Sequence, residues 1–305
     1  MDRLILIKII LCKLTSLSIN FRNNLTFNKQ DKTPVTELDI VNQFICETII
    51  QNYFPFDKII SEEDMNSEFS KKTIIKYEKK IEEVIQIIKS EFFLKKKKDC
   101  DTTHTWFIDP IDGTKGFIDN MTYSIAIAII CNNKITFGGI SSIGLNKIFD
   151  FLPTAVIMIA NDNKVEVLNE KQINITIPQV HNNIQSVAIS RKHKSKELYV
   201  FLNNNNYTLI EIDSQAKYLV VALGLVDIYI REQGSCGNDS DYSWDHLAGI
   251  HLVKVNEGVS KDIENKEVSF DEEEDKIYFN KLLITARNED IFNTTMNLIK
   301  KGYVK

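Results

Sequence analysis

Two aspartates lie three residues apart in a segment whose backbone is restricted. Asp109 and Asp112 flank Pro110 and Ile111, and Gly113 follows. The proline ring fixes one φ angle, whereas glycine accepts backbone conformations that other residues avoid. A turn of this kind can direct both carboxylates and the carbonyl oxygen of Ile111 at one point. Because Mg²⁺ prefers such oxygen ligands, together with water and substrate phosphate, this segment is a candidate metal site.

Three further carboxylates could join the site from other parts of the chain. Glu62 and Glu63 follow the apolar pair at residues 59–60, where we expect a strand to end, and Asp245 lies at the start of an expected helix. Each carboxylate also has a purely structural alternative, because aspartates shape turns and acidic residues cap helices or occupy their first turn. The residue types alone leave both interpretations open.

The longer sequence around the two aspartates favours the metal site. Residues 106–117 read Trp-Phe-Ile-Asp-Pro-Ile-Asp-Gly-Thr-Lys-Gly-Phe. This string resembles the signature of the lithium-sensitive, magnesium-dependent phosphomonoesterases, the superfamily of inositol monophosphatase, fructose-1,6-bisphosphatase and bisphosphate nucleotidase. The superfamily's other motifs are matched in the same order by three segments: Thr33–Asp39, Ser61–Glu63 and Trp244–Gly249. The resemblance therefore extends over almost the whole chain.

Three segments narrow the resemblance to the 3′(2′),5′-bisphosphate nucleotidases: Gly113–Phe117, Asp213–Tyr218 and Ala222–Arg231. The resemblance implies an enzyme of sulfur metabolism that removes the 3′-phosphate of adenosine 3′,5′-bisphosphate and gives AMP and phosphate. It also implies inhibition by Li⁺. The alternatives are an inositol-polyphosphate 1-phosphatase, a broader inositol or sugar phosphate phosphatase, and a binding protein that has lost turnover.

The resemblance also implies roles for individual residues. Two or three Mg²⁺ ions would be held by Glu62, Asp109, the carbonyl of Ile111, Asp112 and Asp245. The attacking water would be positioned or deprotonated by Thr114 with Asp39, and Glu63 would orient a further water. The substrate would be contacted by Thr114, His193, Ser214, Lys217, Arg231 and Asp245.

Three segments depart from the superfamily's pattern. Ser61 stands where glycine is usual before the glutamates, and residues 118–121 lack the usual Arg and Gly. Residues 255–258 read Val-Asn-Glu-Gly where the superfamily has Glu-Ala-Gly-Gly. No expected metal ligand is lost, but we expect the substrate contacts near residues 118–121 to differ.

The elements that position these motifs follow from hydrophobic periodicity. Apolar residues recur at helical spacing over Thr36–Asn52, with Thr36 as N-cap, and over Phe69–Phe93. Residues 4–11 are too short an apolar run to span a membrane and predict an ordinary first helix. Thr105–Ile108 predicts a buried strand that stops at Asp109, because the following proline cannot donate to a ladder.

The remaining pattern indicates an antiparallel sheet followed by alternating strands and helices. The expected sheet strands are Ser124–Ile130, Lys134–Ile140, Lys147–Phe151 and Ala155–Ala160. Further along, we expect strands at 186–190, 208–212 and 228–231, and helices at 195–203, 214–223 and 241–255. Residues 264–275 read as an acidic, exposed insertion.

Two regions follow from this order of elements. Residues 1–160 would form an α+β domain that carries most metal ligands. Residues 161–305 would form an α/β domain with the nucleotide-binding residues and the last metal ligand. The resemblance implies that the whole α/β (α+β) fold is a layered αβαβα sandwich of the inositol monophosphatase and fructose-1,6-bisphosphatase type.

Composition excludes several other classes of protein. The chain has 305 residues with a net charge of −5, which disfavours a polymeric nucleic-acid partner. No charge-free apolar stretch approaches the length of a membrane span. Five scattered cysteines without a C-x-x-C pair argue against a disulfide scaffold or zinc finger and favour a reducing, cytoplasmic location. The Ca²⁺-loop pattern is also absent from the sequence. We expect a monomer that acts on a small phosphorylated substrate.

Overall fold

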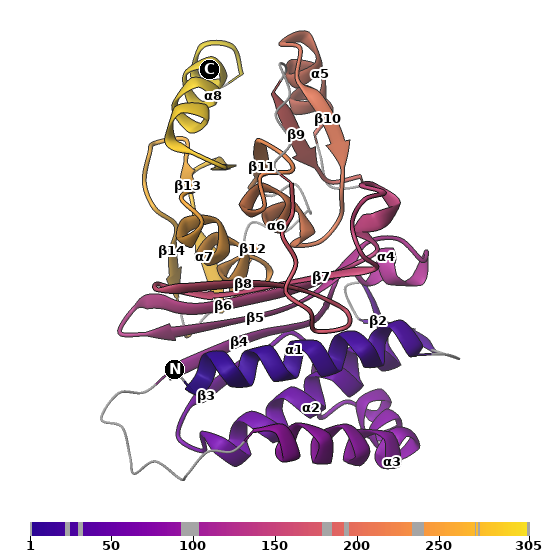
Figure 1. Ribbon diagram of the computed structural model, residues 1–305. Helices are drawn as coiled ribbons and strands as arrows, with labels where there is room; N and C mark the ends of the chain where they lie inside the picture. Colours follow the sequence, from indigo (N-terminus) through magenta and orange to yellow (C-terminus); the bar gives the residue numbers. More distant parts are fainter. Residues whose placement is uncertain are drawn as a thin grey trace.

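Five layers of helices and strands make up the fold. The computed structural model describes residues 2–21, 25–29, 33–92, 104–178, 185–191, 195–233, 241–271, 273 and 275–303. A six-stranded sheet lies between helices α1, α2 and α3 on one face and helices α6 and α7 on the other (Figure 1). A five-stranded sheet follows, and α5 and α8 cover its outer face (Figure 1). The expected layered αβαβα fold is confirmed.

The first helical layer forms where the sequence predicts helices. Its members are α1 (Asp2–Asn20), α2 (Glu37–Tyr53) and α3 (Glu68–Glu91). Thr36 and Asp39 form a capping box at the start of α2, and Ser67 accepts a 3.1 Å hydrogen bond from the Ser70 N–H at the start of α3. In the described part of the chain, no helix is long and apolar enough to cross a membrane.

The six-stranded sheet carries the first metal-ligand segments. Its order is β3 (Lys58–Ser61), β4 (His104–Asp112), β5 (Tyr123–Cys131), β6 (Lys134–Ile143), β7 (Ala155–Asn161) and β8 (Lys164–Asn169). Only β3 and β4 run parallel; the other neighbouring strands are antiparallel. Trp106 and Ile108 pack toward the first helical layer, while Phe107 packs toward α6 and α7. Alternation along β4 therefore fills both cores.

The prediction that β4 stops before the proline is wrong. The strand continues to Asp112, with Asp109 opposite Ala126 and Asp112 opposite Ser124. One extra residue on β4 makes a β-bulge at this point. Pro110 has no backbone N–H, and at a bulge the ladder does not require one. The bulge lies at the two candidate metal ligands.

Two other element predictions were also wrong in part. Residues 147–151 form no strand: a 3-10 helix (Leu145–Lys147) and turns follow Gly144, whose φ is 89°. Residues 241–246 do not belong to the expected α-helix, since β12 (Asp241–Tyr242) pairs with β15 (Lys276–Tyr278) and a 3-10 helix (Ser243–Asp245) follows. The backbone hydrogen bonds of these segments are used in turns and in a small sheet. α7 (Leu247–Val255) begins only after them.

The second large sheet has the order β10-β9-β11-β16-β13. Its strands are β9 (Ser186–Ile189), β10 (Thr208–Glu211), β11 (Ile228–Glu232), β13 (Val259–Asp262) and β16 (Leu282–Ala286). β10, β9 and β11 are parallel, so their carboxyl ends share one edge. Its helices are α5 (Lys196–Asn204), α6 (Ala216–Ala222) and α8 (Glu289–Gly302). The strands and helices expected between residues 186 and 231 are therefore confirmed.

Short elements complete the fold. They are the hairpin of β1 (Thr26–Asn28) and β2 (Pro34–Thr36), helix α4 (Thr114–Ile118), and β14 (Ser269–Asp271), which pairs with β15. β8 extends the first sheet to Asn169, and the division of the chain near residue 160 stays a prediction. Cys12, Cys46 and Cys131 are free thiols, while Cys100 and Cys236 lie outside the described residues.

Candidate metal centre and substrate cavity

Three of the candidate metal ligands converge on one point. Oxygen atoms of Asp109, Asp112 and Asp245 all lie within 4.8 Å of one another. The bulge in β4 presents the first two, and the 3-10 helix before α7 presents Asp245. Glu62 follows β3, whose parallel pairing with β4 brings it to the same edge, and its N–H donates to the Ile108 carbonyl at 3.3 Å.

Burial and like charges would favour cation binding by this cluster. Burial and the charges of Glu62, Asp112 and Asp245 raise the pKa of Asp109 well above its usual range. Burial, then Asp112 and Glu62, raise the pKa of Asp245 in the same way. Oδ2 of Asp109 is buried and has no hydrogen-bond partner among the described residues. A divalent cation would satisfy this oxygen and reduce the repulsion, so the donor set fits such an ion.

Asp112 also contacts the second half of the molecule. The backbone N–H of Gln215 donates to its Oδ2 atom. Burial raises the pKa of Asp112 to about 6, although the Lys217 charge and the Gln215 hydrogen bond lower it. The carbonyl of Ile111 accepts a 3.2 Å hydrogen bond from the Thr114 hydroxyl, at the base of the same bulge.

Asp39 and Thr114 form a hydrogen-bonded pair beside this cluster. The Thr114 hydroxyl donates to Asp39 Oδ1 at 3.3 Å, and the Thr36 N–H donates to Asp39 Oδ2 at 2.9 Å. Burial raises the pKa of Asp39 to about 7, despite the opposing hydrogen bonds from Thr36. Gly113, with a φ of 82°, lets the chain turn from β4 into α4 and thereby places Thr114 here.

Lys29 is a contact of this site that the sequence analysis missed. Its Nζ lies 3.0 Å from Glu62 Oε1 and 2.7 Å from Glu63 Oε1. Burial, Glu62 and Asp39 together raise the pKa of Glu63 to about 8, while Lys29 lowers it. The available signal was the position of Lys29 four residues before the Thr33–Asp39 motif.

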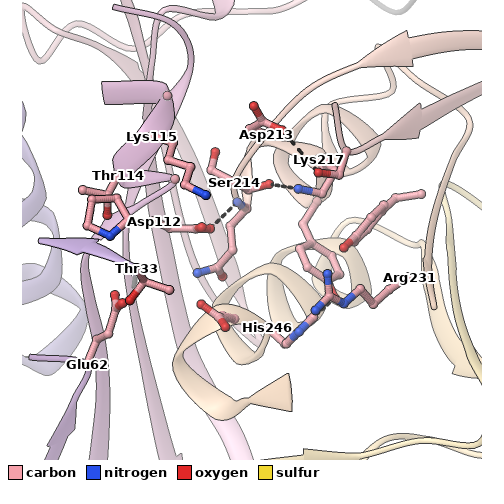
Figure 2. A pocket seen from close by; sticks show the side chains of 18 residues that line it. Thr33, Glu62, Asp112, Thr114, Lys115, Asp213, Ser214, Lys217, Arg231 and His246 are labelled. Atoms are coloured by element: carbon pink, nitrogen blue, oxygen red, sulfur yellow. Dashed lines mark hydrogen bonds between the residues drawn. The ribbon is translucent and has the colours of Figure 1, made fainter. Parts of the chain in front are cut away.

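A cavity of about 260 Å³ opens beside the carboxylates (Figure 2). It is lined by the hairpin, by the metal-ligand segments and by the carboxyl edge of the second sheet. The lining includes Thr33, Glu62, Asp112, Thr114, Lys115, Ser190, Asp213, Ser214, Lys217, Tyr229, Arg231, Asp245 and His246. Asp39 and Asp109 lie deeper, with 0% and 1% of their surface exposed.

Most of the predicted substrate-binding residues line this cavity. Lys217 donates from Nζ to the Ser214 carbonyl at 2.7 Å and lies 5.3 Å from the centre of the Tyr229 ring. Burial lowers its pKa, although Asp112 and Asp213 raise it. The Ser214 hydroxyl shares a 2.9 Å hydrogen bond with Ser124, so it also joins the two sheets. His193 lies outside the described residues.

Arg231 is fixed by a buried network that the sequence analysis also missed. Its Nε donates to Asp241 Oδ1 at 2.9 Å, and His246 Nε2 lies 3.5 Å from the same oxygen. The Tyr218 hydroxyl and His246 Nδ1 are 2.6 Å apart. Burial alone would raise the pKa of Asp241, but His246 and Arg231 lower it to about 2. His246 was quoted as part of the Trp244–Gly249 motif, but its buried partners come from distant segments.

Comparison with known proteins gives consistent matches. A model of the inositol monophosphatase family matches residues 5–298. A 3′(2′),5′-bisphosphate nucleotidase of Schizosaccharomyces pombe is 31% identical over 279 residues, 79% of this chain and 77% of that protein. A protein of the same name in Dictyostelium discoideum is 26% identical over 272 residues, 80% of each chain.

Solved structures match the fold over nearly its whole length. An IMPase of Thermotoga maritima superposes with a TM-score of 0.64 at 19% identity and covers 99% of this chain and 98% of its own. A structure titled IMPase/NADP phosphatase complexed with Mg²⁺ and phosphate has a TM-score of 0.61 at 14% identity, with 95% and 91% coverage. At these identities the likeness establishes the fold.

Proposed function

The chain belongs to the inositol monophosphatase family, and on that premise we propose that it removes the 3′-phosphate of adenosine 3′,5′-bisphosphate in a Mg²⁺-dependent reaction. The products would be AMP and phosphate. One observation carries the proposal: a single cavity has an end lined by the candidate ligand carboxylates and an end lined by two cations, with Asp213 beside Lys217 (Figure 2). Glu62, Asp112 and Asp245 line the first, and Lys217 and Arg231 line the second. A substrate with two phosphates would use both ends.

The carboxylate end would hold the scissile phosphate through Mg²⁺. Two or three ions would be bound by Glu62, Asp109, the Ile111 carbonyl, Asp112 and Asp245. When bound, Mg²⁺ would neutralise charge on the phosphate and lower the pKa of a water.

The chain's own groups would handle the proton of the attacking water. Thr114 would position the water for in-line attack on phosphorus while the bond to the 3′-oxygen breaks. The water's proton would pass by way of the Thr114 hydroxyl to Asp39, which accepts a 3.3 Å hydrogen bond from that hydroxyl. The leaving 3′-oxygen would take a proton from solvent. Glu63 would orient a second water.

The cationic end would bind the phosphate that is retained. Lys217 and Arg231 would supply charge-assisted hydrogen bonds to it. Ser214 and His193 would contact the rest of the nucleotide. The chain's net charge of −5 supports a small-molecule substrate rather than polymeric nucleic acid. We also propose that the enzyme is a cytoplasmic monomer.

A phosphate-release assay tests this function. Adenosine 3′,5′-bisphosphate, inositol 1,4-bisphosphate and inositol monophosphate are compared with Mg²⁺ and with a chelator. We expect the adenosine substrate to have the highest kcat/KM, with no turnover in chelator. Preference for an inositol phosphate would reassign the substrate, and turnover in chelator would exclude the metal mechanism.

Lithium inhibition is a separate expectation of the same site. A cluster of shared carboxylates can bind a small monovalent ion in place of Mg²⁺ with half its charge, which would favour retention of product phosphate without activating water. Titration of Li⁺ at fixed low Mg²⁺ should lower the rate of phosphate release, and excess Mg²⁺ should do the same. An unchanged rate would remove the protein from the lithium-sensitive group.

A further inference from the structure

Helix α2 presents polar side chains to the segments around residues 61–63 and 110–114 of the candidate metal site. Asp39 accepts from Thr114, and Asn42 Nδ2 donates to the Pro110 carbonyl at 3.1 Å. Gln43 and Glu47 follow at helical spacing and face the segment that contains Glu62. Asn42 and Gln43 are at most 1% exposed. A buried polar stripe on a helix is costly unless its groups are paired, so these contacts have a specific purpose.

The Gln43 carboxamide pairs with both backbone groups of Glu63. Its Nε2 donates to the Glu63 carbonyl at 2.8 Å, and its Oε1 accepts from the Glu63 N–H at 2.9 Å. β3 is an edge strand, so the residues that follow it have a sheet neighbour on one side only. Gln43 supplies the backbone partner that a further strand would otherwise provide.

Glu47 holds this carboxamide in place. Its Oε1 accepts from Gln43 Nε2 at 2.9 Å and from the Ser61 hydroxyl at 2.6 Å. Ser61 and Glu63 are the residues on either side of Glu62. The backbone of the glutamate pair is therefore fixed at both ends from α2.

The position of this backbone determines where two carboxylates lie. Glu62 lines the cavity with Asp112 and Asp245. Lys29 Nζ lies 3.0 Å from Glu62 Oε1 and 2.7 Å from Glu63 Oε1. Repulsion between Glu62 and the neighbouring aspartates opposes this placement, and the positive charge of Lys29 offsets part of that repulsion. The two hydrogen bonds between the Gln43 carboxamide and the Glu63 backbone hold the 62–63 segment in this position before any cation binds.

We propose that Gln43, supported by Glu47, is a positioning residue that keeps Glu62 and Glu63 in place for Mg²⁺. The inference rests on the metal site of the proposed function and deepens it. Loss of groups that orient metal ligands typically costs about 10- to 100-fold in metal affinity.

The test compares Gln43→Met with a structural control. Methionine keeps the volume of the side chain but cannot pair with the Glu63 backbone. Thr15→Val is the control, because it removes a buried 2.6 Å hydrogen bond between α1 and Ser141 of β6, away from the cavity. For each purified protein, calorimetry gives the Mg²⁺ affinity without substrate. The Mg²⁺ activation constant, the substrate KM at saturating Mg²⁺ and the Tm are also measured.

We expect Gln43→Met to weaken Mg²⁺ binding about 10-fold or more, with the substrate KM at saturating Mg²⁺ within about 2-fold of wild type. Glu47→Ala should shift Mg²⁺ affinity in the same direction by less, and it serves as the test if Gln43→Met does not fold. Glu47→Gln should restore the wild-type affinity, because an amide oxygen still accepts from Ser61. Thr15→Val should lower Tm and leave Mg²⁺ affinity unchanged.

Unchanged Mg²⁺ affinity in a folded Gln43→Met variant or in Glu47→Ala would overturn the proposal and assign these residues to stability alone. A failure of the proposed function can be distinguished from a failure of this inference. A wild-type protein that binds Mg²⁺ but hydrolyses none of the substrates would refute the reaction, while the difference in affinity between the variants would still support the role of Gln43.

Discussion

Asp109 carries a buried carboxylate oxygen that no donor satisfies within the described segments. Its neighbours are themselves acidic, so the charge of Asp109 is unfavourable until a cation binds. The same residue is therefore costly for stability and useful for metal binding. Active sites commonly combine these two properties, because ligands suited to a cation repel each other without it.

The variant Asp109→Asn separates the two properties. An amide keeps the volume but removes the charge, so Mg²⁺-supported kcat/KM should fall by about 100-fold or more, on the scale of several kcal/mol of charge stabilisation. Without metal, Tm should equal or exceed that of wild type. Circular dichroism checks the fold and phosphate release checks the rate. Near-normal activity at saturating Mg²⁺ would refute the ligand assignment.

Lys217 is expected to distinguish substrates rather than support the common reaction. It lines the cationic end of the cavity and is nearly buried, so a phosphate bound there meets a poorly hydrated charge. Lys217→Met should reduce kcat/KM for adenosine 3′,5′-bisphosphate by about 2–3 kcal/mol, roughly 30- to 150-fold. Inositol monophosphate, with no second phosphate, should lose much less. Equal losses on both substrates would place Lys217 in the common chemistry or in the fold.

At the scale of elements, local patterns predicted the helices and strands better than they predicted irregular segments. The capping box of α2 and the alternation of Trp106, Phe107 and Ile108 are encoded by neighbours in sequence; α2 formed as expected, and β4 formed where it was expected but continues past Pro110. The bulge at Pro110 depends on how β4 pairs with β5, which no local pattern contains. Glutamine is a residue type typical of exposed helix positions, so the sequence contains no sign of a role for Gln43. Its proposed role depends on the tertiary contact with Glu63.

The same limit explains which parts of the candidate site the sequence could predict. Four motifs pointed to the carboxylates and Thr114, and the Asp213–Tyr218 segment pointed to Lys217, because their residue types and order are characteristic. Lys29 and the contacts of His246 and Asp241 were missed, since ion pairs and buried hydrogen bonds form between segments that are distant in the chain.

The packing of α7 on β6 contains a buried histidine that should make the fold sensitive to acid. His251 is 2% exposed, and its Nε2 has no hydrogen-bond partner in the described part of the chain. Its imidazole lies against Gly138, where a Cβ atom would come within 3.1 Å of the ring. Burial lowers the pKa of His251 from 6.5 to about 4.

Because the folded pKa is lowered, the unfolded chain binds the proton first as pH falls. The stability contributed by neutral His251 is therefore complete above pH 6.5 and is lost progressively between about pH 6.5 and 4, by at most about 3 kcal/mol. His251→Gln should flatten the dependence of unfolding free energy on pH in this window. Denaturant titrations from pH 7 to 4 measure the difference, and parallel profiles for the two proteins would contradict it.

At the scale of the whole molecule, the cavity joins the two large sheets. Glu62, Asp109 and Asp112 lie at the edge of the first sheet, Asp245 precedes α7 between the sheets, and Arg231 belongs to the second sheet. A cation bound by carboxylates from these layers would resist their separation. Metal binding and global stability should therefore be linked.

This linkage predicts a metal-dependent Tm. Mg²⁺ at about 100 times its dissociation constant should add about 2.7 kcal/mol and raise Tm by several degrees. Asp245→Asn should abolish most of that increase, because the remaining carboxylates all belong to the first sheet. Calorimetric scans with Mg²⁺ and with chelator give the two shifts. An equal increase in the variant would show that the cation binds without Asp245.

The separation of Asp112 from Asp245 also has a consequence for the timing of biosynthesis. The two residues are 245 − 112 = 133 positions apart. Translation proceeds at about 5–20 residues per second, so roughly 7 to 27 s pass after Asp112 is added before Asp245 is added. During that interval the nascent polypeptide lacks Asp245, one of the proposed metal ligands. A truncated chain released in that interval would bind Mg²⁺ more weakly than the full chain, because it would lack Asp245.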